Sequence, residues 1–417
     1  MVNTRWAGIV RAGYLFLPLM AVACQALGLN APYRTLIYVN IGLVVILAHR
    51  EWLRPGSRGT MAAIVAMPLA LIVLQLLSGG PNVRDIRHLV AITFLTIGIW
   101  QLASVPPSDA KVERRLYLVA LIGIVGYAAL QSFLVAMTSN HFGTTKNPHY
   151  LAQYCLMLIP VATYLFHRSS PALRLLAGTA LVALFALLLD TASRPAWLSL
   201  LLAAVLALWL RRQILSWWTV VMVAVIGVLY AANVSDFAGR IDDLYANIGT
   251  EERVFIWRDT WTAQLAGSAW QWLVGHGIDH FRDAYRHFST RDFGIDFNTP
   301  HNFLLELLYT SGIAGLVVVI AAIASLYRLG LRLYRDTGHA SFVLVLLVVL
   351  TANLAFVSIT VSFFTSHTLM PLAIIAGLLL SLRETLAHDN IPAQAIRSDP
   401  AASPMAPRID ALPLAPA

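Results

Sequence analysis

The chain has 417 residues, of which 58% are hydrophobic and only 12% are charged, and its formal net charge is +8. Its mean hydropathy is +0.70. A soluble protein carries about a quarter charged residues, so a chain this apolar has the bilayer as its solvent. Basic charge in the short loops of such a chain indicates membrane orientation, and we therefore expect no nucleic-acid partner.

Apolar runs of the length that crosses a bilayer recur along the sequence. Because a helix satisfies its own backbone polar groups in lipid, they predict an all-α integral membrane protein with about twelve transmembrane helices. The last two spans are the hardest to separate. The expected spans are 12–29, 35–49, 60–78, 88–104, 115–138, 149–167, 173–190, 195–210, 214–232, 301–327, 341–359 and 361–382.

These spans divide the chain into four parts. Residues 1–232 hold the first nine spans, 233–300 form one large loop, and 301–388 hold the last three spans. Residues 389–417 are rich in Pro and Ala without apolar periodicity, which predicts a disordered tail.

The loop charges predict the orientation of the chain. Arginine and lysine concentrate in one set of loops, together with both termini, and this set is cytoplasmic by the positive-inside rule. The large loop then lies on the opposite, outer face. The cytoplasmic set contains Arg5, Arg11, Arg50, Arg54, Arg58, Lys111, Arg114, Arg115, Arg168, Arg174, Arg211, Arg212, Arg328, Arg332, Arg335, Arg383, Arg397 and Arg408.

The large loop is expected to contain helices. Residues 251–266 read as an amphipathic helix with Arg253, Trp257 and Trp261 on one side. Trp270 and Trp272 follow, and such side chains suit a water–lipid interface. A second helical stretch, about 278–287, comes after Gly275-His276-Gly277.

A spaced motif begins where this loop ends. His301-Asn302 is followed by nine residues and then by Gly312-Ile313-Ala314-Gly315. A neutral imidazole at a membrane–water boundary is suited to general-base chemistry, and Glu306 places an ionisable group inside the same span. We therefore take His301 as a candidate catalytic base. Asn302 is a candidate to hold the ring or a substrate by hydrogen bonds, and the two glycines are expected to allow close helix packing.

Arginines on the expected outer face form a second candidate group, because the positive-inside rule disfavours them there. Guanidinium groups match phosphate oxygens in a bidentate manner, so these side chains predict binding of a phosphorylated lipid. Arg194 and Arg253 are the strongest candidates and are assigned a catalytic role. The expected substrate-binding residues are Arg84, Arg87, Lys146, Asn147, His149, Trp257 and Arg258.

A metal site and a disulfide are not expected. His276 and His280 have the spacing of two ligands on a helix, but Gly277 interrupts the pair and no H-E-x-x-H pattern occurs. Cys24 and Cys155 fall in separate expected spans, which gives no disulfide framework.

The sequence resembles the bacterial O-antigen ligases and the wider O-antigen ligase/polymerase superfamily. The resemblance covers the plan of about twelve spans with one large late loop, and it is carried most specifically by the motif H-N-x9-G-x-x-G from His301 to Gly315. Arg194, in Ser-Arg-Pro-Ala-Trp, looks like the family's outer-face arginine at a span start. Arg253, followed by Trp257 and the later Gly-His-Gly, looks like the family's loop pattern.

The resemblance implies a metal-independent glycosyltransferase of the integral-membrane, GT-C-like type that needs no cofactor. Its donor would be a glycan on undecaprenyl pyrophosphate, and its acceptor a sugar hydroxyl of lipid A–core oligosaccharide. The protein would lie in the bacterial inner membrane among its lipids, with a periplasmic site. His301 would act as base in an inverting transfer, while Arg194 and Arg253 would stabilise the pyrophosphate.

Three other functions remain open. An O-antigen polymerase uses the same donor chemistry with a second lipid-linked glycan as acceptor. A protein O-oligosaccharyltransferase tends to carry an extra C-terminal region, which this short tail does not resemble. A lipid-linked glycan transporter would need ionisable residues near the bilayer midplane, and Glu306 is one candidate.

Overall fold

The fold is that of a computed structural model of the chain. It describes residues 20–21, 23–29, 34–42, 58–79, 83–103, 110–138, 143–144, 147–168, 170–191, 193–211, 252–278, 280–291, 297–337 and 340–398. This part of the chain is helical and contains no strand. The helices are α3 (Arg58–Leu77), α4 (Val83–Ala103), α5 (Ala110–Thr138), α6 (Pro148–Arg168), α7 (Pro171–Asp190), α8 (Arg194–Leu210), α11 (Glu252–Leu265), α12 (Ala269–Val274), α13 (Phe281–Phe288), α14 (Phe303–Asp336), α15 (Ser341–Val357) and α16 (Ser366–Ser398).

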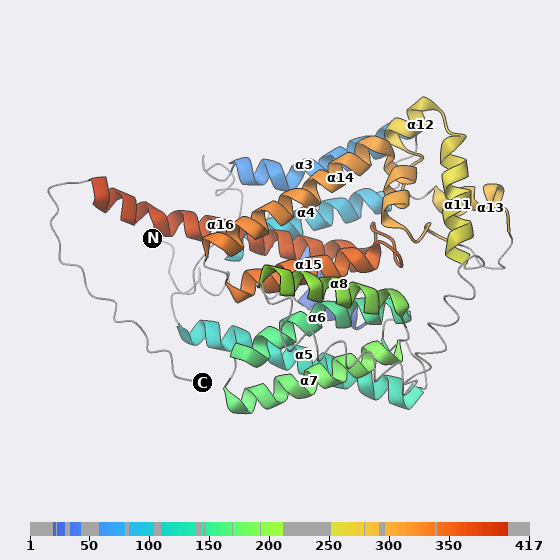
Figure 1. The fold of residues 1–417 in the computed structure, drawn as a ribbon. Helices are drawn as coiled ribbons and strands as arrows, with labels where there is room; N and C mark the ends of the chain where they lie inside the picture. The colour runs from blue at the N-terminus through green and yellow to red at the C-terminus, as the bar shows by residue number, and fades with distance from the viewer. Residues whose placement is uncertain are drawn as a thin grey trace.

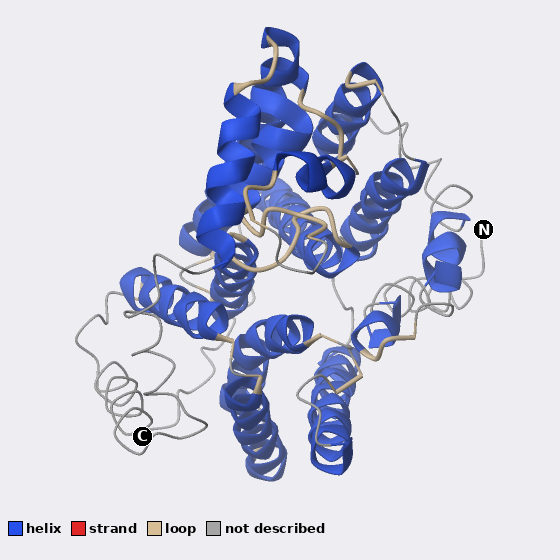
Figure 2. Ribbon diagram, turned by 90° about the vertical axis from the view of Figure 1, so that its right-hand side faces the viewer, coloured by secondary structure: helices blue, strands red, loops and turns tan. Residues whose placement is uncertain are grey.

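Nine of these helices form a bundle, and the other three gather at one end of it. The long apolar helices run alongside one another, while α11, α12 and α13 lie together at the end where α14 begins (Figure 1). The view onto that end shows the bundle helices nearly end-on (Figure 2). Within the bundle α16 packs on α4, α7 on α6 and α15 on α8, whereas α12 packs on α14 and α3.

The apolar composition of the bundle helices agrees with an integral membrane protein. Within the described residues, six segments are long and apolar enough to cross a bilayer, and three shorter apolar helices accompany them. Nine expected spans correspond to described helices. Spans 12–29 and 35–49 are described only in part, and span 214–232 lies outside the described residues. The six segments are Arg58–Leu77, Ala120–Thr138, Pro148–Arg168, Pro171–Asp190, Phe303–Asp336 and Ser366–Glu384.

The loop helices also follow the sequence pattern. The amphipathic stretch expected at 251–266 is α11, and the stretch expected at about 278–287 is α13, which begins at Phe281. Between them lies α12, a short helix that periodicity alone did not predict. Ser268 begins it with a capping box, in which the Ser268 hydroxyl accepts from Gln271 N and the Gln271 side chain accepts from Ser268 N.

The span expected as one helix at 301–327 is broken at Gly312. This residue has φ +64° and ψ −170°, so α14 consists of a short first part before the break and a long second part after it. Figure 1 shows the change of direction beside α12. Gly312 therefore breaks the helix and, as expected, also allows a close approach, because a Cβ there would lie 2.3 Å from Leu273 O of α12. Gly315 also lies in a close contact, because a Cβ there would meet Ser311 at 2.2 Å and Leu74 of α3 at 3.5 Å.

The backbone of residues 273–277 crosses the backbone of α14 at residues 309–312, and this backbone crossing explains why glycine stands at the break. A Cβ on Gly312 would lie 2.3 Å from Leu273 O, and a Cβ on Gly275 would lie 2.4 Å from Thr310 O. In this crossing His276 N donates to Tyr309 O at 2.8 Å and Gly277 N donates to Thr310 O at 2.9 Å. The expected Gly-His-Gly segment therefore pairs, backbone to backbone, with the carbonyls that precede the break in α14.

Helix α16 continues past the expected start of the tail. It ends at Ser398, whereas the tail was expected from residue 389. Once a helix is nucleated, each further residue adds one backbone hydrogen bond, and Ala393, Gln394 and Ala395 are favourable helix formers.

Candidate functional site

His301 lies in a strained turn directly before α14. Its φ is +51°, and it is the only residue other than glycine with a positive φ in the described part of the chain. A side chain in this conformation is uncommon and such strain concentrates at functional sites. The ring nitrogen Nδ1 lies 2.7 Å from the backbone oxygen of Thr360, in the segment between α15 and α16.

This hydrogen bond determines which ring nitrogen carries the proton. A backbone carbonyl can only accept, so Nδ1 of His301 must donate to Thr360 O. In the neutral ring the second nitrogen, Nε2, then holds a lone pair. The structure thus presents an imidazole whose tautomer is fixed for taking up a proton at Nε2.

The surroundings of His301 keep its ring neutral. Burial lowers the pKa of the imidazole below its usual value, and the positive charge of Arg253 lowers this pKa further, while the hydrogen bond to Thr360 opposes both effects. The net direction is downward. The ring is therefore uncharged at neutral pH, which is the form that a general base requires.

Arg253, His149 and His301 come together from three separate elements. Arg253 lies in the first turn of α11, His149 in the first turn of α6, and His301 directly before α14. Each of the three lies close enough to the other two for their charges to interact. Two of the predicted site residues, Arg253 and His149, are thus brought next to His301 from positions 48 and 152 residues earlier in the chain.

The start of α8 joins the same region through His149. The Nδ1 atom of His149 lies 3.4 Å from Oγ of Ser193, the residue that precedes α8. Arg194 is the first residue of that helix and is half-buried. Within the described residues, no carboxylate or hydrogen-bond acceptor contacts its guanidinium group. Arg194 therefore stands at the edge of the site with its donors uncommitted.

Three helices begin beside His149 and His301, and the electrostatic potential of their N-termini favours negative charge there. The N-terminal ends of α6, α8 and α14 meet around His149, Ser193 and His301. Backbone N–H groups at a helix N-terminus are unpaired and the helix dipole is positive there. Together with Arg194 and Arg253 they make a region of positive potential.

Trp257 supports the turn that carries His301. Its indole Nε1 donates to the backbone oxygen of Pro300 at 2.9 Å. Phe297 adds an edge-to-face contact, with its ring centroid 6.0 Å from that of His301. The side chain expected to bind substrate therefore holds the backbone directly before the candidate base.

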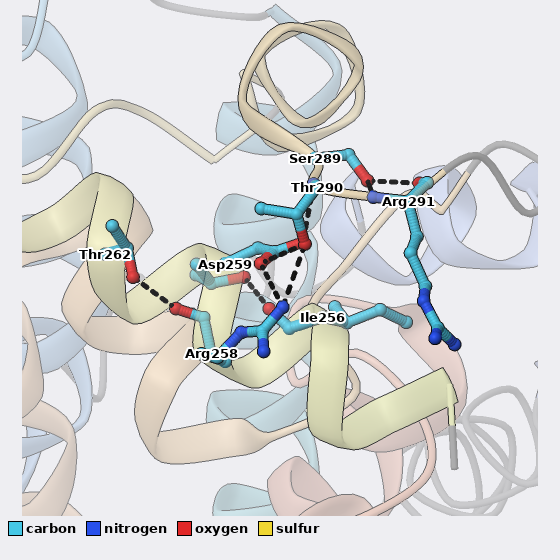
Figure 3. Close-up of polar contacts among 8 residues, drawn as sticks. Ile256, Arg258, Asp259, Thr262, Ser289, Thr290 and Arg291 are labelled. Carbon is cyan, nitrogen blue, oxygen red and sulfur yellow. Dashed lines mark hydrogen bonds and ion pairs between the residues drawn. The ribbon is translucent and has the colours of Figure 1, made fainter. Parts of the chain in front are cut away.

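A polar network fixes α11 to the segment after α13 (Figure 3). The buried carboxylate of Asp259 accepts from Thr290 N at 2.9 Å and lies 2.8 Å from the hydroxyl of Thr290. Arg258 donates to the same hydroxyl at 3.0 Å and forms an ion pair with Asp259 at 3.6 Å. The side chain of Arg258 is 58% exposed. It belongs to a network that positions α11, on the helix that also carries Arg253.

The other predicted residues take different positions. Asn302 caps α14, since its side-chain oxygen accepts from Leu305 N at 3.1 Å. Asn147 caps the start of α6 and accepts from His149 N at 2.8 Å. Arg87 is exposed on α4, which packs on α16 and α3. Lys146 and the side chain of Arg84 lie outside the described residues.

Sequence reasoning missed Thr360 and Ser193, which contact the two histidines. Both were overlooked because they contribute through partners distant in the chain. A signal existed for Thr360, since residues 358–365 read Ser-Ile-Thr-Val-Ser-Phe-Phe-Thr, a polar interruption between two apolar runs. Within the described residues, no group of three or more His, Cys, Asp or Glu side chains is placed to hold a metal ion.

Comparison with known families matches one part of the chain. The family model described as O-antigen ligase matches residues 179–320. Over this segment the chain is similar to the O-antigen ligase superfamily. The matched segment contains Arg194, Arg253, Trp257 and His301. His149 and Thr360 lie outside it. A search of curated proteins found no match.

Proposed function

We propose that this protein is an O-antigen ligase, which transfers a glycan from undecaprenyl pyrophosphate to a sugar hydroxyl of lipid A–core oligosaccharide on the periplasmic face of the inner membrane. The observation that carries the proposal is the hydrogen bond from His301 Nδ1 to Thr360 O. It leaves Nε2 as the proton acceptor of a neutral ring at the end of the bundle where α11, α12 and α13 gather.

The transfer begins with deprotonation of the acceptor. Nε2 of His301 takes the proton from the acceptor hydroxyl as its oxygen attacks the anomeric carbon of the donor sugar. The bond between that carbon and the pyrophosphate oxygen breaks, and its electron pair leaves with undecaprenyl pyrophosphate. The anomeric configuration inverts because attack and departure occur on opposite faces. The imidazolium then releases its proton to water.

The leaving group gains negative charge during this step. Arg253 lies beside His301, and Arg194 begins α8 next to His149. Guanidinium groups bind phosphate oxygens through two parallel hydrogen bonds, and three helix N-termini add to the positive potential. Groups fixed in place before the reaction stabilise the developing charge most effectively, because they need no reorganisation during it.

Burial of the base contributes to the same chemistry. Desolvation holds the His301 ring in its neutral form, so each turnover starts from a base ready to accept. A polymerase would use the same donor half of this site and differ only in the acceptor. The functions are therefore distinguished by their products and not by the residues around His301.

The test is complementation of a strain that lacks this gene, read on a lipopolysaccharide gel. We expect the deletion to leave bare lipid A–core while long glycan accumulates on its undecaprenyl carrier, and the wild-type gene to restore ligation. The copy with His301→Ala should fail to do so at normal expression, because the base contributes about 10²- to 10⁴-fold to the rate. Core capped by one repeat unit would instead indicate a polymerase.

A matched control separates loss of the base from loss of the fold. Tyr327→Phe removes a partly buried hydroxyl from α14 that bonds to Thr351 Oγ1 at 2.7 Å, well beyond the break at Gly312. This variant should restore ligation as the wild type does. Full rescue by His301→Ala would refute the assignment of the base and favour a transporter.

A further inference from the structure

We infer that Glu306 is a positioning residue for His301, acting through the segment 358–365 between α15 and α16. The inference rests on the proposed role of His301 as the base. Glu306 lies in the first turn of α14 and is 2% exposed. It does not touch the reacting atoms, and its effect passes through the backbone that it holds.

The carboxylate of Glu306 organises this segment through two donors. Ser362 Oγ donates to Oε1 of Glu306, and the backbone N of Phe363 donates to Oε2 at 2.8 Å. Ser362 is itself tied into the segment, because its Oγ accepts from Phe364 N at 3.1 Å. Its backbone oxygen also accepts from the hydroxyl of Thr368 at 3.0 Å. Both carboxylate oxygens thus fix one turn of backbone.

The same turn supplies the partner of the candidate base. Thr360 stands two residues before Ser362, and its backbone oxygen accepts from His301 Nδ1 at 2.7 Å. The start of α14 is therefore attached to the 358–365 segment at two points, through His301 at Thr360 and through Glu306 at Ser362 and Phe363. The segment can move relative to His301 only if the bonds to Glu306 break.

The cost of a buried carboxylate supports a specific role. An ionisable side chain in a transmembrane helix is expensive unless its partners are in place, and such residues are candidates for function. An apolar residue at this position would pack without that cost. Glu306 accepts from a backbone N–H and a hydroxyl at once, which an apolar side chain cannot do. Holding the 358–365 segment is the function that these contacts serve.

The experiment compares Glu306→Ala with Glu306→Gln in the purified full-length protein in lipid nanodiscs. The substrates are an undecaprenyl-pyrophosphate glycan and lipid A–core from a strain that lacks the gene. We expect Glu306→Ala to lower kcat by about 100-fold, because a displacement of about 1 Å at the reacting groups has this effect. KM should stay near the wild-type value, since Glu306 makes no substrate contact.

Glu306→Gln should retain activity to within a few-fold. The amide oxygen still accepts from Phe363 N, while the amide nitrogen donates to the second lone pair of Ser362 Oγ. Rescue by this variant would identify hydrogen bonding to the segment as the role of Glu306. Equal loss in the Gln and Ala variants would contradict it.

The pH profile gives a readout that general destabilisation does not move. The bond to Thr360 raises the pKa of His301 against the effects of burial and of Arg253. If Glu306→Ala releases Thr360, the acid limb of kcat/KM should move to lower pH, because the bond that raises the pKa of His301 is lost. The charged groups that face the ring from neighbouring helices, Arg253 and His149, are unchanged in this variant.

Two controls make the outcome decisive. Tyr327→Phe loses a partly buried hydrogen bond in the same helix and should keep the wild-type kcat and pH profile. Wild-type kcat and pH profile in Glu306→Ala, with His301→Ala inactive, would overturn this inference alone. Full activity in His301→Ala would overturn the proposed base instead, whatever Glu306 does.

Discussion

Replacement of Gly312 by alanine should disrupt both the stability of the protein and its activity. Gly312 has φ +64° and ψ −170°, a conformation that is essentially reserved for glycine and costs an alanine about 1–3 kcal/mol. The added Cβ would also lie 2.3 Å from Leu273 O and 2.6 Å from Val274 N. These are backbone atoms, so no side-chain rotation can relieve the contact.

The magnitude follows from what must move. Relief of the contact displaces the backbone crossing, in which His276 N and Gly277 N donate to Tyr309 O and Thr310 O. Each such hydrogen bond contributes about 0.5–1.5 kcal/mol, so strain and lost bonds together reach about 2–6 kcal/mol. A loss of this size is a substantial fraction of the stability of a protein domain.

The assay is thermal unfolding of the purified variant in detergent, alongside ligation in cells. Gly126→Ala in α5 is the matched control, because a Cβ there has no atom within 4 Å and alanine favours the helix. We expect a clearly lower Tm and loss of ligation for Gly312→Ala, and a Tm at or above the wild type for Gly126→Ala. Equal Tm and activity in the two variants would refute the argument.

Three further predictions concern the surroundings of the base. Because the pKa of His301 is lowered, kcat/KM of the wild type should fall only below about pH 6.5. Arg253→Gln removes a positive charge beside the ring, so the acid limb of its rate–pH profile should lie at higher pH. Trp257→Phe loses the bond to Pro300 O, worth about 0.5–1.5 kcal/mol, and should lower kcat several-fold in the nanodisc assay without unfolding the protein. Asn302→Ala loses the cap of α14 and about 1 kcal/mol of stability, measured as a lower Tm, and Asn302→Ser should restore it.

The sequence was sufficient where a property depends on local pattern. Apolar runs predicted nine described bundle helices to within a few residues at most ends, and the amphipathic pattern at 251–266 predicted α11. The spaced motif singled out His301, the outer-face arginines included Arg253, and the Lys146, Asn147 and His149 group supplied His149. The structure brings these three residues together. Helical periodicity and residue chemistry are both encoded in neighbouring residues.

The sequence was insufficient where the cause lies far away in the chain. The break of α14 at Gly312 depends on the backbone of residues 273–277, which crosses there, and no local signal in the sequence predicts that break. Thr360 faces His301 from 59 residues away, through a backbone oxygen that any residue would carry. Trp257 was expected to bind substrate, and no local signal predicted that its indole donates to Pro300 O, 43 residues later in the chain.

The break at Gly312 also gives a physical meaning to the spacing of the motif. Nine residues, Phe303 to Ser311, separate the cap of α14 from the break, and as a helix they span about 13 Å. One end of this short helix carries His301 and, one turn further, Glu306, both attached to the 358–365 segment. The other end is fixed by the crossing with residues 273–277. A helix turns by about 100° per residue, so only this length lets both ends meet their partners on the correct faces. The spacing therefore links the candidate base to the crossing beside α11 and α12 through one rigid element.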